Sequence, residues 1–203
     1  MTYVVFDLET TSLNPVTGEI LTGSFIKCDE EFNQAQILNL TFRPLVHKDF
    51  WDASAQNIHG ISWEAAQDFT PAMESMAELD AFLEGVSTRC VFANYQQVQG
   101  KYYFDVAYLR SYYDNYFGFY SLNQKCQWQV SAHTLYKKIH SGPANLKAVC
   151  KALGIEQLSH HDAGDDARVT LEIFKQLGND MAVKSFRRPM IDIKKIIDLE
   201  VVI

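Results

Sequence analysis

A segment near the N-terminus, YVVFDLET at residues 3–10, constrains the fold more than any other part of the chain. Its valines, tyrosine and phenylalanine favour a β-strand, yet it carries two acids, Asp7 and Glu9, two positions apart. Alternate residues of a strand share one face of a sheet, so both carboxylates point to the same side. At that spacing they can converge on one or two divalent cations, or they can lie solvated where the strand ends.

The composition is that of an ordinary globular protein, and 203 residues suffice for one domain with a sizeable core. No apolar run approaches the roughly 20 residues that span a bilayer, and the N-terminus lacks the basic segment of a signal peptide. With no export signal, the four cysteines are expected to be reduced thiols. They lie far apart with no C-x-x-C pair, which argues against a zinc site. We therefore expect a cytoplasmic protein without a membrane segment.

The formal net charge of −7 disfavours a protein that coats nucleic acid through basic side chains. Acids gathered around bound divalent cations, however, do not repel phosphate as free acids do. The charge therefore leaves metal-dependent chemistry on phosphodiesters open.

Apolar periodicity and turn residues predict a mixed α/β fold. Strands with short connections, which favour an antiparallel meander, are expected at 2–10, 20–28 and 34–44. The later elements are two helices within 62–85, a strand at 88–96, and helices at 104–117, 145–155 and 165–178. The segment 128–139 fits a strand or a helix. A meander followed by alternating helices and strands is typical of an α/β domain with a mixed sheet.

Two further acids can join the first pair. Asp105 opens the helix expected at 104–117, where aspartate is also a common cap. Asp166 begins the apolar stripe of the last helix, which continues at Thr170 and Ile173. An acid on such a stripe is costly unless it is paired or bound to a metal.

A histidine precedes the last of these acids. His161 stands five residues before Asp166, in the loop that leads into the last helix. Histidine is the side chain best suited to proton transfer near neutral pH, although a loop histidine can also bond the start of a helix. We expect Asp162 and Asp165, in the first turn, to be solvated or to cap the helix.

Taken in order, these signals are far more specific than each is alone. Asp-x-Glu on a first strand, an aspartate that opens a mid-chain helix, and His-x-Ala-x-x-Asp at the last helix resemble the DnaQ-like (DEDDh) 3′–5′ exonucleases. FDLETTSL resembles the first motif of that family, and HDAGDD, which runs from His161 to Asp166, resembles the third. The segments NIHGISWEAAQ and NLKAVCKALGI are also similar to the family, and the resemblance covers about residues 1–178.

The second motif departs from the family pattern. The family places an asparagine a few residues before Phe-Asp, whereas several extra residues separate Asn94 from Asp105 here. Either the loop is longer or Asn94 is not the equivalent residue. Phe104-Asp105 followed by Val106 and Leu109 still fits the motif.

The resemblance implies a ribonuclease-H-like fold over residues 1–180, with a mixed five-stranded sheet in the order 3-2-1-4-5 flanked by helices. It implies that His161 is a general base and that two Mg²⁺ or Mn²⁺ ions are held by four carboxylates, Asp7, Glu9, Asp105 and Asp166. The implied reaction releases nucleoside 5′-monophosphates from the 3′ end of single-stranded DNA or RNA.

Six residues are implied to contact the substrate: Thr10, Thr11, Ser12, Leu13, His59 and Asn94. The first four follow the first motif and would lie under the terminal nucleotide, with Leu13 against its base. Ordinary turn chemistry is the alternative for these four. His59 would flank the base or form part of a helix-entry turn.

DNA is favoured over RNA as the substrate, only because it is the family's commoner use. The alternatives are an exoribonuclease or oligoribonuclease-like enzyme, and a subunit of a polymerase or repair complex that acts mainly by binding. The tail at 181–203 is basic and then apolar. It is expected to be an edge strand or, through residues 184–203, a docking segment for a polymerase or another protein partner.

Overall fold

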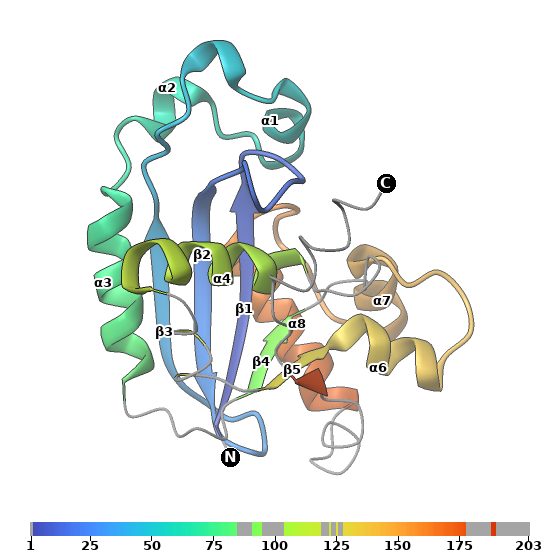
Figure 1. The fold of residues 1–203 in the computed structure, drawn as a ribbon. Coiled ribbons are helices and arrows are strands. Elements are labelled where there is room, and N and C mark those ends of the chain that lie inside the picture. The colour runs from blue at the N-terminus through green and yellow to red at the C-terminus, as the bar shows by residue number, and fades with distance from the viewer. Residues whose placement is uncertain are drawn as a thin grey trace, which may run out of the picture.

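The computed structural model describes residues 2–84, 91–94, 104–118, 122, 125, 128–177 and 188–189, with the backbone alone at 91–94 and 188–189. These residues form a mixed β-sheet with helices on both faces (Figure 1). The strands are β1 (Tyr3–Thr10), β2 (Ile20–Cys28), β3 (Gln34–Thr41), β4 (Val91–Asn94), β5 (Trp128–Ser131) and β6 (Arg188–Pro189). Their order across the sheet is β3-β2-β1-β4-β5-β6.

The pairing of the strands agrees with a mixed sheet. β1, β2 and β3 form the expected antiparallel meander, whereas β4 and β5 run parallel to β1. The predicted mixed α/β class is therefore confirmed. The described sheet has six strands instead of the five predicted, because Arg188–Pro189 pairs with β5. The rest of the tail at 181–203 lies outside the described residues, so its docking role stays a prediction.

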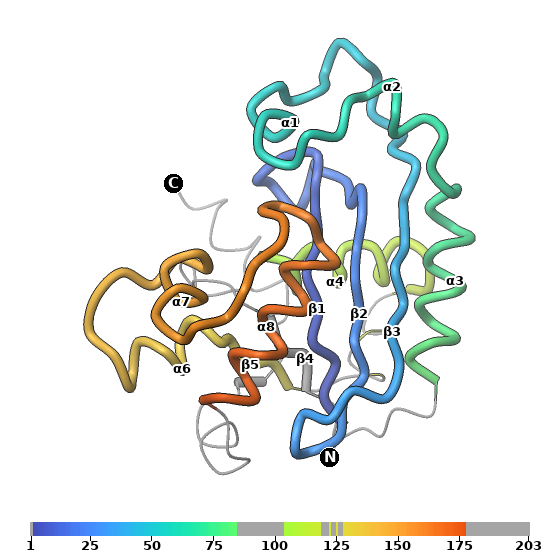
Figure 2. Tube along the Cα trace, turned by 180° about the vertical axis from the view of Figure 1, so that it is seen from behind, coloured from blue at the N-terminus to red at the C-terminus, as the bar shows by residue number. Residues whose placement is uncertain are grey.

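Eight helical segments are described: η1 (Lys48–Phe50), α1 (Ala53–His59), α2 (Trp63–Ala66), α3 (Ala72–Leu83), α4 (Phe104–Phe117), α6 (Ala132–Ile139), α7 (Leu146–Leu153) and α8 (Ala163–Leu177). Helices α3 and α4 pack on one face of the sheet and α8 on the other, as the two opposite views show (Figures 1 and 2). Helices α1 and α2 lie beyond the carboxyl end of β1 (Figure 1).

Strand β1 separates two hydrophobic cores. Its even-numbered side chains pack with α3 and α4, and its odd-numbered side chains Tyr3 and Val5 pack with α6, α7 and α8. Strict alternation along the strand therefore turns Asp7 and Glu9 toward the α8 side.

Aromatic contacts fix α8 relative to β1. Phe174 of α8 is fully buried and stacks on Phe32, with ring centroids 5.2 Å apart. Phe32 in turn lies 4.6 Å from the ring of Tyr3 at the start of β1. The predicted inward stripe is confirmed at Thr170 and Ile173, which are both fully buried. This packing determines where along β1 the first turn of α8 lies.

The helix predictions hold, and the structure adds η1, α1 and α6. The two helices expected within 62–85 are α2 and α3. The ambiguous segment 128–139 contains both elements, because Ser131 ends β5 and caps α6 by accepting the N–H of Thr134. Helix α1 was not predicted. It is a short helix with no buried residue, so it lacks an apolar stripe, and it begins at a side-chain cap on Asp52.

Within the part of the chain that the structure describes, no helix combines the length and the apolar character needed to cross a membrane.

The aromatic contact of α8 predicts a large loss of stability on truncation. Phe174→Ala should lower the free energy of unfolding by about 3–5 kcal/mol, because it leaves a cavity between α8 and the sheet. Phe50→Ala is the matched control, since Phe50 is 79% exposed and its loss should change stability by less than about 0.5 kcal/mol. Urea denaturation of both variants measures the difference, and equal losses would contradict the assigned core.

Candidate active site

Asp7 and Glu9 lie near the carboxyl end of β1, on the face that α8 covers. The pairing of β1 with the parallel strand β4 runs from Tyr3 to Val5, so both acids follow the paired stretch. Glu9 is only 9% exposed. The alternative that both acids are simply solvated at a strand end is therefore wrong for Glu9.

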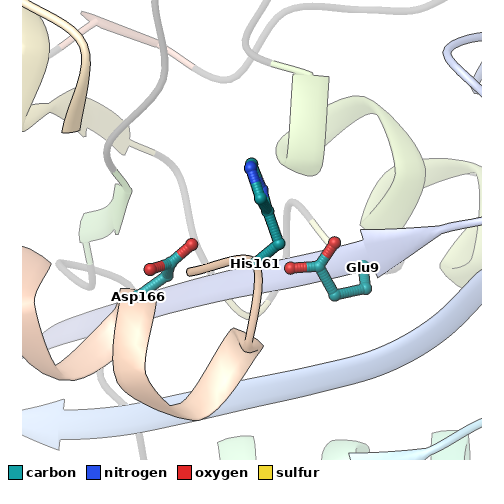
Figure 3. Close-up of side chains that lie close together, drawn as sticks. All are labelled: Glu9, His161 and Asp166. Atoms are coloured by element: carbon teal, nitrogen blue, oxygen red, sulfur yellow. The ribbon is translucent and has the colours of Figure 1, made fainter. Parts of the chain in front are cut away.

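The start of α8 brings two more side chains to this place. Ligand atoms of Glu9, His161 and Asp166 all lie within 4.8 Å of one another, and their side chains gather between β1 and the first turn of α8 (Figure 3). The two carboxylates are buried, whereas His161 is exposed. The site therefore has a buried acidic floor and a histidine that solvent can reach.

Asp105 comes to the same place from the opposite side of the sheet. It lies in the first turn of α4 and is 1% exposed. Its charge is the strongest of the neighbouring charges that raise the pKa of Asp7. The structure thus brings all four acids, which three separate elements supply, close enough for their charges to act on Asp7. Asp7 and Asp105 lie outside the closest group of possible ligands.

Burial and mutual repulsion make this cluster hard to ionise. Burial raises the pKa of Asp7 well above its usual value, and the charges of Asp105 and Glu9 raise it further. Burial and then the charge of Asp166 raise the pKa of Glu9 from 4.5 to about 8. Burial also raises the pKa of Asp166, although the Gln157 hydrogen bond and the nearby His161 partly offset this.

Such a donor set fits divalent cations. Carboxylate oxygens are the ligands that Mg²⁺ and Mn²⁺ prefer, and cations would remove the repulsion that raises these pKa values. Neither of the two described cysteines, Cys28 and Cys150, belongs to the group of possible ligands. This chemistry suits hard cations better than a structural zinc ion.

Asp162 and Asp165, the two other acids at the start of α8, have different hydrogen-bonding roles. Asp162 caps α8, because its side chain accepts the N–H of Asp165 at 2.9 Å. Asp165 is neither solvated nor a cap, and in this respect the prediction was wrong. It is 8% exposed and accepts hydrogen bonds from Arg168 and from the main-chain N–H groups of Leu158 and Ser159.

The four residues after Glu9 divide into two kinds. Thr10 and Thr11 are buried, and their hydroxyls bond the chain itself, at Ser12 O and at the N–H of Glu19. The hydroxyl of Ser12 accepts the N–H of Asn14 at 3.2 Å, so Ser12 belongs with the two threonines. Leu13, in contrast, is 80% exposed beside the site. The threonines therefore shape the loop, and Leu13 is the member that projects from it.

A tyrosine that no motif points to holds this loop. Tyr108 stands three residues after Asp105 on α4, and its single hydroxyl proton is shared between the carbonyls of Ser12 and Asn14, at 2.6 and 3.0 Å. A Cβ at Gly18 would lie 2.1 Å from the Tyr108 hydroxyl. Only glycine therefore fits there. The i, i+3 spacing of Tyr108 from Asp105 places both on one side of α4, but spacing does not identify the partners of Tyr108.

His59 and Asn94 are the two remaining residues predicted to contact the substrate, and His59 lies beside the site. His59 is the last residue of α1, and burial and the nearby His161 lower its pKa. Its Nδ1 accepts the N–H of Ile61 at 3.0 Å, which leaves the proton of the neutral ring on Nε2. Asn94 ends β4, where its backbone is in register with Ser131; its side chain lies outside the described residues.

The sequence profile of the RNase T exonuclease family matches residues 4–174, and the chain belongs to this family. It is a DnaQ-like (DEDDh) exonuclease of the ribonuclease-H-like superfamily, as the motifs predicted. Membership defines the class of protein as a nuclease, a hydrolase of phosphodiester bonds. Members of this family generally depend on divalent metal ions. Comparison with the curated proteins finds no match.

Solved structures of exonuclease I share the fold. The complex of Escherichia coli exonuclease I with a 5cy-dT13 oligonucleotide is 18% identical, with a TM-score of 0.71 over 91% of this chain and 42% of that chain. A structure of SSB/exonuclease I with the inhibitor CFAM is 17% identical, with a TM-score of 0.71 over 91% and 43%. Exonuclease I of Methylocaldum szegediense is 18% identical, with a TM-score of 0.67 over 86% and 39%. The chain therefore spans about two fifths of these proteins.

The raised pKa of Glu9 predicts how the stability of the metal-free protein depends on pH. The unfolded chain releases this proton near pH 4.5, whereas the folded chain holds it until about pH 8. A raised pKa contributes stability at low pH that is lost between these two values. The free energy of unfolding in EDTA should therefore fall as pH rises from 5 to 8, and Glu9→Gln should flatten this fall.

Urea denaturation at several pH values, in EDTA and in Mg²⁺, measures this dependence. Glu9→Gln should be more stable than the wild type in EDTA at pH 8 and should gain less from Mg²⁺. Glu78→Gln, on the exposed face of α3, is the control and should follow the wild type. A wild type that becomes more stable in EDTA between pH 5 and 8 would show that the cluster is not electrostatically strained.

Proposed function

We propose that this protein is a metal-dependent 3′–5′ exonuclease that releases nucleoside 5′-monophosphates from single-stranded nucleic acid, with DNA favoured. The observation that carries the proposal is the convergence of Glu9, His161 and Asp166 within 4.8 Å, beside the carboxylates of Asp7 and Asp105. A buried acidic floor with an exposed histidine above it suits hydrolysis of a phosphodiester.

Two Mg²⁺ or Mn²⁺ ions are the cofactors of this proposal, held by Asp7, Glu9, Asp105 and Asp166. When bound, such ions lower the pKa of a coordinated water and neutralise charge on the departing oxygen. The protein's part is to hold four mutually repelling carboxylates in one place from β1, α4 and α8. The rigid sheet and the two buried helix ends supply that fixed arrangement.

His161 is the general base of the proposal. One imidazole nitrogen accepts a proton from the attacking water while the water oxygen bonds to phosphorus. The bond from phosphorus to the 3′-oxygen of the preceding nucleotide breaks. That oxygen takes a proton from solvent and becomes the new 3′-hydroxyl, and the terminal nucleoside 5′-monophosphate is released. The exposure of His161 supports this role, because the proton must then pass to solvent.

Substrate contacts come from the loop after β1 and from the end of α1. The exposed side chain of Leu13 is placed against the base of the terminal nucleotide, above the ordered loop of Thr10, Thr11 and Ser12. His59 stays a candidate through its place near His161. Asn94 stays a candidate through its position at the end of β4.

Single-stranded DNA as the substrate is supported by what the similar proteins bind. Escherichia coli exonuclease I has been solved with dT13 and dA16 oligonucleotides, and exonuclease I also with SSB. For this chain, single-stranded DNA stays a proposal, and RNA is the alternative that the assay below tests. We also propose that residues 184–203 bind a protein partner. A cytoplasmic location is part of the proposal, and the free thiols of Cys28 and Cys150 favour it.

A labelled-oligonucleotide assay tests the reaction. With Mg²⁺, the wild type should shorten 5′-labelled single-stranded DNA from its 3′ end and release mononucleotides. Asp7→Ala should abolish cleavage, because it removes a metal ligand. His161→Ala should lower the rate by about 10²- to 10⁴-fold and leave Mn²⁺ binding intact. His160→Ala is the matched control, because its side chain is also exposed but lies outside the group of possible ligands.

This assay tests the enzyme assignment, the general base and the preference for DNA separately. If wild type and Asp7→Ala are equally inert on DNA and RNA, the enzyme assignment fails. If His161→Ala retains the full rate, only the general base is wrong. Faster cleavage of a matched RNA strand would overturn the preference for DNA without touching the mechanism.

Tyr108→Phe tests whether the loop after β1 binds substrate. The change removes the hydrogen bonds to Ser12 and Asn14, each worth about 0.5–1.5 kcal/mol, so KM for the oligonucleotide should rise several-fold while Mn²⁺ affinity stays unchanged. Tyr116→Phe, two turns further along α4, is the matched control and should leave KM unchanged. An unaltered KM in Tyr108→Phe would exclude a substrate role for the ordered loop.

A further inference from the structure

A glutamine outside every motif contacts one of the four acids. The side-chain amide of Gln157 donates from Nε2 to Oδ1 of Asp166 at 2.7 Å. The reverse orientation of the amide would place its oxygen against the carboxylate, so the donor must face Asp166. One oxygen of Asp166 is thereby engaged, and its direction relative to Glu9 is fixed.

The loop that carries Gln157 is itself tied to α8. Asp165 Oδ2 accepts the main-chain N–H groups of Leu158 and Ser159 at 2.7 and 2.9 Å. Arg168 bonds Asp165 Oδ1 through two nitrogens, at 2.9 and 2.7 Å, and also donates to the carbonyl of Glu156 at 2.6 Å. These contacts hold the main chain on both sides of Gln157.

The same ties limit the freedom of His161. Its backbone has a φ of 57°, a left-handed conformation that is uncommon for residues other than glycine. Asp165 fixes the chain before it, at Ser159, and the cap at Asp162 fixes the chain after it. The loop therefore presents both Gln157 and His161 from a backbone that is held at both ends.

We propose that Gln157 is a positioning residue that orients Asp166 for cation binding, with Asp165 and Arg168 holding its loop; this rests on the proposed metal-dependent function. The uncharged amide suits this role. It holds a carboxylate oxygen without cancelling the negative charge, whereas a lysine or arginine there would compete with the cation for it.

Metal titration of Gln157→Met tests this role. Methionine has a similar length but no N–H, so Asp166 loses its partner. Calorimetric titration of the metal-free protein with Mn²⁺ should show a dissociation constant about 10- to 100-fold higher than that of the wild type. The rate on a single-stranded oligonucleotide should recover as Mn²⁺ is raised, with an unchanged KM for the oligonucleotide. Gln176→Met, at an exposed glutamine on α8, is the matched control and should bind Mn²⁺ normally.

A Mn²⁺ dissociation constant within twofold of the wild type would overturn the proposal. Melting in EDTA shows whether the variant is folded. If Gln157→Met does not fold, Gln157→Asn decides by the same titration, because it keeps the amide but is one methylene too short to reach Asp166. Normal binding in Gln157→Asn would then overturn the proposal. A wild type that binds no Mn²⁺ would instead overturn the metal-dependent function itself, together with this inference.

Discussion

Repulsion among buried carboxylates is the constraint on which this structure depends. Burial raises the pKa values of Asp7, Glu9 and Asp166, and the charges of neighbouring carboxylates raise those of Asp7 and Glu9 further. A flexible chain would relax this strain by turning the acids outward. Here the sheet fixes Asp7 and Glu9. The aromatic contacts from Phe174 to Tyr3 fix the position of α8 along β1, and with it Asp166. The free energy of the hydrophobic cores therefore maintains an acidic site that is unfavourable without cations.

Helix α4 joins this acidic site to the loop after β1. Asp105 in its first turn raises the pKa of Asp7, and Tyr108, one turn later, bonds the carbonyls of Ser12 and Asn14. A rigid helix thus fixes the distance between the proposed cation ligands and the proposed floor for the terminal nucleotide. Helix α4 therefore helps to position both the proposed cation site and the loop that is proposed to bind the terminal nucleotide.

Local periodicity explains which parts of the site were predictable. Strand alternation turns Asp7 and Glu9 to one face, and the apolar stripe of the last helix turns Asp166 inward, so neither placement needed long-range information. Gln157 and Tyr108 could not be found in this way, because their partners depend on how separate segments pack. The short helix α1 has no apolar stripe, and the pairing of Arg188–Pro189 with β5 depends on contacts across the sheet. The fold class was therefore more predictable than the number of strands.

Two adjacent acids on α8 show how the surroundings of a carboxylate decide its role. Hydrogen bonds from Ser159 and Arg168 outweigh burial and hold the pKa of Asp165 below its usual value. For Asp166, the neutral amide of Gln157, the nearby imidazole and a backbone hydrogen bond at His161 offset burial only in part, and its pKa is raised. The charge of Asp165 is therefore satisfied within the protein, where it ties the loop to the helix. The charge of Asp166 is left largely uncompensated, which is the condition under which a bound cation gains the most from it.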